Sequence, residues 1–266
     1  MKFWNLHTHS TFSDGKNSID EMVKAAIDRG FCAIGMSDHS YTACDESYCM
    51  KPAQYPEYLA QIKNAKEMYR GQIEVFTGME LDYFSNVDRS LFDYIIGSVH
   101  YVEANGIYYA VDHAAAIQQK CVNESFGGDF NAMAKRYYEE LTTHILSTHA
   151  DIVGHFDVIA KFSLFDESDP IYQRIALEAM DAILETDAIF EVNTGAIARG
   201  YRKIPYPVDF LLRHILEKKG RITWGADCHA TQNTDYAFCE TLQLLRSLGF
   251  KSMAKPTANG FEDVGI

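Results

Sequence analysis

The sequence predicts an α/β fold, a distorted (β/α)7 barrel of the TIM type, from two observations. Short apolar runs alternate with amphipathic segments along most of the chain, as expected for parallel strands joined by right-handed helical crossovers. Polar side chains follow directly after most of these runs, and barrels of this type carry their active sites at the carboxyl ends of the strands. A doubly wound open sheet is the alternative. It is less favoured because no glycine-rich phosphate-binding sequence follows the first predicted strand.

The first elements form a strand–helix–strand unit. Residues 2–6 mix apolar and polar side chains, which predicts a short strand. Asn17 or Ser18 is expected to cap a helix that carries an apolar stripe and ends at Gly30. The apolar run over residues 31–36 predicts a buried strand.

The rest of the chain continues this alternation. Five more strands are expected, over residues 73–79, 92–99, 152–154, 188–192 and 221–224. Helices are expected over residues 56–69, 130–146, 170–184, 208–218 and 237–248. Residues 101–129 lack a periodic pattern and predict a functional loop or lid. With seven strands in 266 residues and no linker-like segment, we expect a single domain over residues 1–266.

Composition restricts the class of protein and its partners. The formal net charge of −13 argues against a nucleic-acid surface, because the phosphate backbone would be repelled. No apolar run approaches the roughly 18 residues of a membrane span, and the N-terminus lacks a signal-peptide pattern. A cytoplasmic protein without a membrane partner is therefore expected, while its oligomeric state is left open. The six cysteines show no C-x-x-C spacing and are expected to be reduced thiols.

Imidazole and carboxylate side chains gather where the predicted strands end. Six of the ten histidines fall at such positions, and two residues that are two apart in an extended chain can face one ion. The candidates are His7, His9, Asp14, Asp38, His39, Glu80, His100, His155, Asp227 and His229. Such ligands without a thiolate cage suit Zn²⁺, Mn²⁺ or Fe²⁺ in an open catalytic site. They are too many for one ion and fit three divalent ions that share a bridging ligand.

Other polar residues receive simpler interpretations. His113, His144, His149 and His214 do not follow a strand and are expected to be surface or satisfied core residues, although His113 lies in the possible lid. Glu139 and Glu140 are expected on an exposed helix face. Asp45 and Glu46 are expected to be solvated, with recognition of a cationic substrate as the alternative.

Seven short motifs occur in an order that resembles the PHP (polymerase and histidinol phosphatase) family. They are His7-Thr8-His9 with Ser13-Asp14-Gly15, Ser37-Asp38-His39, Gly78-Met79-Glu80, Gly97-Ser98-Val99-His100, Gly154-His155-Phe156-Asp157, Glu191-Val192-Asn193-Thr194 and Gly225-Ala226-Asp227-Cys228-His229. The resemblance implies a metallo-phosphoesterase with three metal ions on a distorted seven-stranded barrel. It implies three ligand groups: His7, His9, Glu80 and Asp227; Glu80 as a bridge with His100 and His155; and Asp14, His39 and His229.

The chain resembles the histidinol-phosphatase branch of that family most. The implied reaction is hydrolysis of L-histidinol phosphate to L-histidinol and phosphate by a metal-bound hydroxide, a step of histidine biosynthesis. Lys161 and Arg199 are implied to grip the phosphate, with Arg202 as a competing ligand. Asp227 or His229 is a candidate proton donor to the leaving oxygen, and Asp38 is implied to orient the neighbouring ligands. The alternatives are a family phosphoesterase acting on another small phosphate ester or nucleotide, and a metal-binding module without catalysis.

Overall fold

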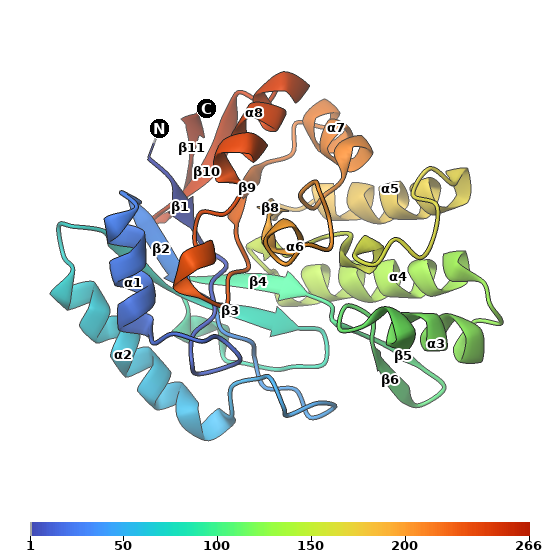
Figure 1. The fold of residues 1–266 in the computed structure, drawn as a ribbon, viewed down its shortest axis with the longest axis horizontal. Coiled ribbons are helices and arrows are strands. Elements are labelled where there is room, and N and C mark those ends of the chain that lie inside the picture. The colour runs from blue at the N-terminus through green and yellow to red at the C-terminus, as the bar shows by residue number, and fades with distance from the viewer. Residues whose placement is uncertain (1) are drawn as a thin grey trace.

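The computed structural model describes residues 2–266, which form a parallel sheet that curves into a nearly closed barrel (Figure 1). Its seven strands are hydrogen-bonded in the order β1–β2–β3–β4–β7–β8–β9. They are β1 (Trp4–Asn5), β2 (Ala33–Met36), β3 (Glu74–Asp82), β4 (Tyr94–Ser98), β7 (Ile152–Val153), β8 (Ile189–Asn193) and β9 (Ile222–Gly225). A parallel bridge between Thr8 and Cys228 links the ends of the sheet just beyond β1 and β9. The predicted barrel and its seven strands are confirmed.

Helices cover the outside of the barrel (Figure 1). The longer ones are α1 (Ile19–Asp28), α2 (Tyr55–Met68), α4 (Phe130–Thr148), α5 (Pro170–Leu184), α7 (Asp209–Glu217) and α8 (Phe238–Leu248). Ser18 is the cap of α1: its side chain accepts a hydrogen bond from the Glu21 N–H, and the Glu21 carboxylate accepts one from the Ser18 N–H. Among residues 2–266, no helix combines the length and the hydrophobicity that a membrane-spanning segment needs.

Two hairpins lie outside the barrel sheet, and neither was predicted. Residues 101–129, expected to be irregular, contain an antiparallel hairpin of β5 (Tyr101–Ala104) and β6 (Ile107–Ala110), followed by helix α3 (Ala115–Ser125). The turn is Asn105-Gly106, and both residues have positive φ, as a two-residue hairpin turn requires. At the C-terminus, β10 (Ser252–Thr257) pairs with β11 (Gly260–Gly265). A short helix α6 (Gly195–Ala198) follows β8.

The β5–β6 hairpin is attached to α4 through a buried carboxyl group, that of Glu140. Its Oε1 lies 3.0 Å from Nε of Arg136 and accepts a hydrogen bond from the Glu103 backbone N–H. The Glu140 side chain is 2% exposed, against 56% for Glu139. The prediction that both lie on an exposed helix face is therefore wrong for Glu140. The helix turns this position toward the hairpin, which the sequence does not predict. Burial raises the pKa of Glu140 to about 7.

This raised pKa predicts a pH-dependent stability. The pKa of Glu140 is higher in the folded chain than its ordinary value of 4.5, so the folded chain favours the protonated carboxyl group. The contribution of this group to the free energy of unfolding is therefore complete below pH 4.5 and is lost as the pH rises to about 7. Glu140→Gln is therefore expected to match the wild-type free energy of unfolding near pH 4.5 and to exceed it at pH 8 by on the order of 2 kcal/mol. Denaturant unfolding at both pH values measures this. Glu139→Gln is the matched control, and an equal difference at both pH values would contradict the prediction.

Candidate metal centre and catalytic cavity

All nine predicted metal ligands lie at the carboxyl-terminal end of the barrel, because each follows a strand or ends one. Residues from the loops after β1, β2, β4, β7 and β9 meet Glu80, which lies near the end of β3. Asp14 is exposed and His229 is partly exposed, whereas the other seven are buried. Sequence separations of more than 200 residues thus become contacts of a few ångströms.

Glu80 lies at the centre of this cluster, and its two carboxylate oxygens face different histidines. Oε2 lies 3.1 Å from His7 Nε2 and 3.6 Å from His9 Nε2. Oε1 lies 3.0 Å from His155 Nε2 and 3.3 Å from His100 Nε2. This division fits a carboxylate that bridges two metal ions with one oxygen on each.

The potential ligand atoms form four overlapping groups. In each group, no two ligand atoms are more than 4.8 Å apart. These groups are His7, His9 and Asp227; His7, Glu80 and His155; His39, Glu80 and His100; and His9, Asp14, His39 and His229. They contain all nine residues of the three implied ligand groups. Three histidines are more widely shared than expected. His39 Nδ1 lies 2.9 Å from Glu80 Oε2, His9 joins the group around Asp14, and His7 joins that of His155.

The unpaired atoms of the cluster test whether a cation fits there. His7 Nε2, both ring nitrogens of His9 and Glu80 Oε2 are buried and have no hydrogen-bond partner within residues 2–266. Buried polar atoms without partners are costly. Of these atoms, the Nε2 atoms of His7 and His9 lie 3.1 and 3.6 Å from Glu80 Oε2. Imidazole nitrogens and carboxylate oxygens are the donor set of an open zinc, manganese or iron site. The residues present therefore fit divalent metal ions.

Carboxylates behind the histidines fix which ring nitrogen faces the cluster. His7 Nδ1 lies 2.6 Å from Glu191 Oε1, and His100 Nδ1 lies 3.1 Å from Asp82 Oδ2, so that Nε2 of each ring faces Glu80. Glu191 Oε2 also accepts a hydrogen bond from the His155 N–H. The sequence interpretation assigned no role to Glu191, which lies within β8, or to Asp82, which ends β3 two residues after Glu80.

The local electrostatics favour the metal-binding form at Glu80 and His9. Burial raises the pKa of Glu80, but His7, His39 and the other histidines around it hold that pKa well below its usual range. Burial and the neighbouring His229 and His39 lower the pKa of His9 to about 3, so its ring is neutral. An ionised carboxylate and a neutral imidazole are the states that bind divalent ions. At His7 and His100 burial lowers the pKa, but the neighbouring carboxylates outweigh it and raise the pKa well above its usual range, so these rings must lose a proton when a metal ion binds.

Asp38, one of the predicted catalytic residues, lies behind the cluster and outside the cavity. Its buried carboxylate accepts hydrogen bonds from the backbone N–H and the hydroxyl of both Ser10 and Ser13, at 2.6–3.1 Å. These contacts hold the loop that carries Asp14. The arrangement favours a positioning role for Asp38.

Asp38→Asn is therefore expected to keep most of the bound metal and to lower stability. An amide oxygen can accept only part of the four hydrogen bonds, and the amide NH₂ faces the donors, which we expect to cost about 1–3 kcal/mol. Elemental analysis together with denaturant unfolding measures both effects. Complete loss of metal from a folded Asp38→Asn variant would contradict this assignment.

A cavity of about 310 Å³ opens above the cluster. Apart from the metal-binding candidates, its wall includes Asp45, Tyr48, Tyr101, Asp112, Lys161 and Arg199. Lys161 Nζ donates a hydrogen bond to the Asp112 carbonyl oxygen at 2.6 Å, and Arg199 donates to Asp227 Oδ2 at 2.7 Å. Both predicted phosphate-binding cations therefore line the cavity. His113 lines it as well, although its sequence position favoured a surface or core role.

Two other candidate residues do not line this cavity. Arg202, the competing phosphate ligand, forms a two-pronged ion pair with Glu167 at 2.8 and 2.9 Å. Glu46 pairs with Lys51 at 2.8 Å, whereas its neighbour Asp45 reaches the cavity wall and accepts a hydrogen bond from the Tyr101 hydroxyl. The sequence from Arg199 to Arg202 did not indicate which of the two arginines faces the cavity, because the turn after α6 has no periodic pattern of apolar residues.

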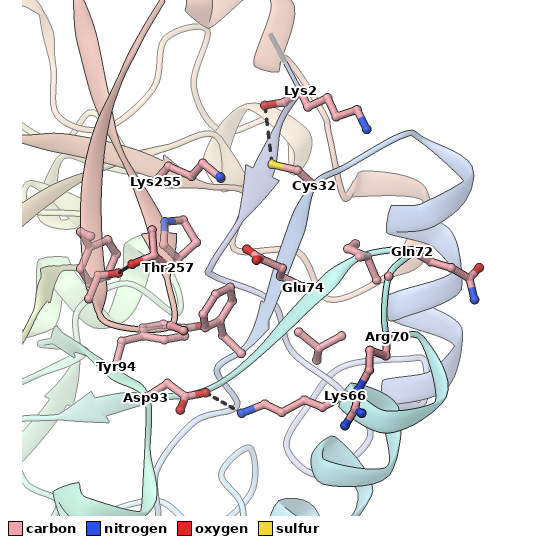
Figure 2. Close-up of a pocket in the computed structure, with 18 residues that line it drawn as sticks. Lys2, Cys32, Lys66, Arg70, Gln72, Glu74, Asp93, Tyr94, Lys255 and Thr257 are labelled. Atoms are coloured by element: carbon pink, nitrogen blue, oxygen red, sulfur yellow. Dashed lines mark hydrogen bonds and ion pairs between the residues drawn. The ribbon is translucent and has the colours of Figure 1, made fainter.

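A second cavity, of about 960 Å³, lies near the beginnings of β3 and β4 and the β10–β11 hairpin (Figure 2). Lys66 and Asp93 pair there at 2.6 Å, and Glu74 and Lys255 project into it. This cavity has no histidine and none of the predicted site residues. The metal-binding candidates are thus confined to the other end of the barrel among the described residues.

Residues 5–195 match the PHP domain family. A protein of Deinococcus radiodurans named probable histidinol-phosphatase is 27% identical over 246 residues, covering 88% of this chain and 88% of that protein. The histidinol-phosphatase of Bacillus subtilis is 25% identical over 258 residues, covering 87% of this chain and 95% of that protein. The structure of histidinol phosphate phosphatase from Lactococcus lactis, complexed with zinc, L-histidinol and phosphate, has the same fold: the TM-score is 0.70 at 20% identity, over 98% of this chain and 99% of that one.

Proposed function

The chain belongs to the PHP domain family, and we propose that it is a metal-dependent phosphatase that hydrolyses L-histidinol phosphate to L-histidinol and phosphate, a step of histidine biosynthesis. One observation carries the proposal. The Glu80 carboxylate divides its oxygens between two sets of histidines, directly below a cavity whose wall carries Lys161 and Arg199. The names of the relatives that align over most of their length, with those of Deinococcus and Bacillus among them, favour this substrate.

The metal centre takes three divalent ions, Zn²⁺, Mn²⁺ or Fe²⁺, in this proposal. His7, His9, Glu80 and Asp227 would hold one; Glu80, His100 and His155 would hold the second; Asp14, His39 and His229 would hold the third. Such ions lower the pKa of water from 15.7 to about 7 and offset negative charge on the phosphate, as zinc does in other hydrolases.

The side chains of the cavity bind and orient the substrate. Lys161 and Arg199 carry the positive charge on the side of β7 and β8, where they attract the phosphate group. Arg199 also holds Asp227 in place through its side-chain and backbone oxygens, at 2.7 and 3.0 Å. The substrate phosphate therefore lies next to the residue that anchors one metal position.

The proton for the leaving group does not come readily from the two candidates of the sequence analysis. Burial alone would raise the pKa of Asp227, but Arg199 and His7 hold it well below its usual range, so this carboxylate stays ionised. His229 is a ligand in the proposal, with Nε2 3.2 Å from Asp14 Oδ1. A group that binds a metal through its lone pair has no proton there to donate.

A phosphate-release assay tests the proposed function. L-Histidinol phosphate is compared with other small phosphate esters, a nucleotide and single-stranded DNA, with Mn²⁺ or Zn²⁺ added. The expected result is preferred turnover of L-histidinol phosphate, lost on chelation and restored by the metal. Faster turnover of another ester or a nucleotide would replace the substrate, and absence of turnover of every phosphate ester would favour a metal-binding module.

A further inference from the structure

The hydroxyl of Tyr48 is a polar group of the cavity that has no partner. Tyr48 lies in the loop after β2 and lines the cavity, and its Oη is buried without a hydrogen bond to any residue from 2 to 266. Its ring stands edge-on to His39, with 4.8 Å between ring centroids, and stacks on Tyr101 at 6.3 Å. The hydroxyl of Tyr101, by contrast, donates to Asp45 at 2.8 Å.

An unpaired buried hydroxyl lowers the stability of the folded chain. Leaving such a group without a partner is unfavourable, whereas phenylalanine would fill nearly the same space without that penalty. Groups that weaken the fold in this way are typical of functional sites, where the partner arrives with the ligand. The position of the Tyr48 hydroxyl therefore indicates a ligand atom that accepts its hydrogen bond.

The strand order shows which part of the substrate lies near Tyr48. In the ring of seven strands, β2 is three strands from β7 and, counted through β1 and β9, three strands from β8. Lys161 follows β7 and Arg199 follows β8. The Tyr48 ring instead contacts His39 after β2 and Tyr101 after β4, so Tyr48 and the cations line different sides of the cavity. If the phosphate group of a phosphomonoester binds the cations, an ester oxygen directed toward the opposite wall of the cavity faces Tyr48.

We propose that Tyr48 donates a hydrogen bond to the ester oxygen of the bound phosphomonoester and stabilises the negative charge that develops there. This inference rests on the proposed function. The oxygen of water forms a bond to phosphorus while the ester P–O bond breaks, and its electron pair stays on the leaving alkoxide. A proton of the attacking water reaches that alkoxide by way of the solvent. Tyr48 keeps its own proton throughout, since the ordinary pKa of tyrosine is about 10 and burial raises it further in Tyr48.

The dependence of the rate on the leaving group tests this role. Tyr48→Phe is compared with wild type on alkyl phosphates, among them L-histidinol phosphate and glycerol phosphate, and on p-nitrophenyl phosphate. Loss of a donor to a developing oxyanion lowers kcat by about 100-fold or more. We expect such a fall for the alkyl esters with little change in KM. We expect less than about a fivefold fall for p-nitrophenyl phosphate, because its leaving group disperses the charge without help.

Tyr101→Phe is the matched control, because the Tyr101 hydroxyl is already paired with Asp45. It should change the rates of both ester classes by the same factor. Tyr48→Phe should also keep the metal content of the wild type and unfold at the same temperature or a higher one. An equal effect of Tyr48→Phe on both ester classes, no effect on either, or a loss of metal would overturn the inference. Wild type that hydrolyses glycerol phosphate but not L-histidinol phosphate would instead contradict the proposed substrate, and the leaving-group comparison would still decide the role of Tyr48.

Discussion

Glu80→Ala is expected to lose the two metal ions that flank Glu80 and to lower kcat/KM by at least about 1,000-fold. The reason is geometric. One carboxylate oxygen lies 3.1 Å from His7 Nε2 and the other lies 3.0 Å from His155 Nε2, so one substitution removes a ligand from two positions. Elemental analysis of the purified variant after dialysis against Mn²⁺ or Zn²⁺, beside the phosphate-release assay, measures both losses.

The same strand provides a matched control, Glu74→Ala. Glu74 begins β3 and Glu80 lies near its end, so the two glutamates lie at opposite ends of the barrel. Glu74 is exposed in the cavity of Figure 2, away from the histidines. Its replacement should leave metal content and activity near those of the wild type. An unchanged metal content in Glu80→Ala would defeat the bridging assignment, whatever the activity of the variant.

Lys161→Gln is expected to lower kcat/KM for the phosphate ester by about 100-fold, mainly through KM. A hydrogen bond to a charged group contributes about 1.5–3 kcal/mol, and the Lys161 side chain, only 10% exposed, gives its charge little screening by water. Lys161→Arg should recover most of the affinity, since a guanidinium grips a phosphate with two parallel hydrogen bonds. Steady-state kinetics of both variants, with phosphate as a competitive inhibitor, measure this.

Arg202→Gln separates phosphate binding from structural ion pairing. Arg202 is paired with Glu167 and does not line the cavity, so its loss should lower stability by about 1–3 kcal/mol and leave KM unchanged. If Arg202→Gln raised KM as much as Lys161→Gln does, Arg202 would have to contact the phosphate group, which would contradict binding within the described cavity.

The barrel was predictable because its strands are buried on both faces. The run that ends at Met36 and the run before Asn193 are apolar and short, and each is followed by a helical pattern. The two hairpins depend on a tight turn and on packing against the rest of the protein. Neither produces a strong periodic pattern of apolar residues in the sequence. The Asn105-Gly106 turn was a usable signal for the first of them.

The metal centre was more predictable than the cavity above it. Ligands at strand ends meet whenever a barrel closes, so the proximity of His9 and His229 can be predicted from topology alone. The walls of the cavity come from loops, where side-chain direction depends on contacts that no periodicity encodes. Tyr48 and Asp112 were therefore not singled out, and Arg199 could not be separated from Arg202.

Anomalous X-ray scattering from crystals of the zinc-loaded protein, recorded at the zinc absorption edge, tests the central claim most directly. We predict two peaks on either side of the Glu80 carboxylate and a third beside Asp14, His39 and His229. A single peak, or ions bound away from Glu80, would contradict the proposed three-ion centre.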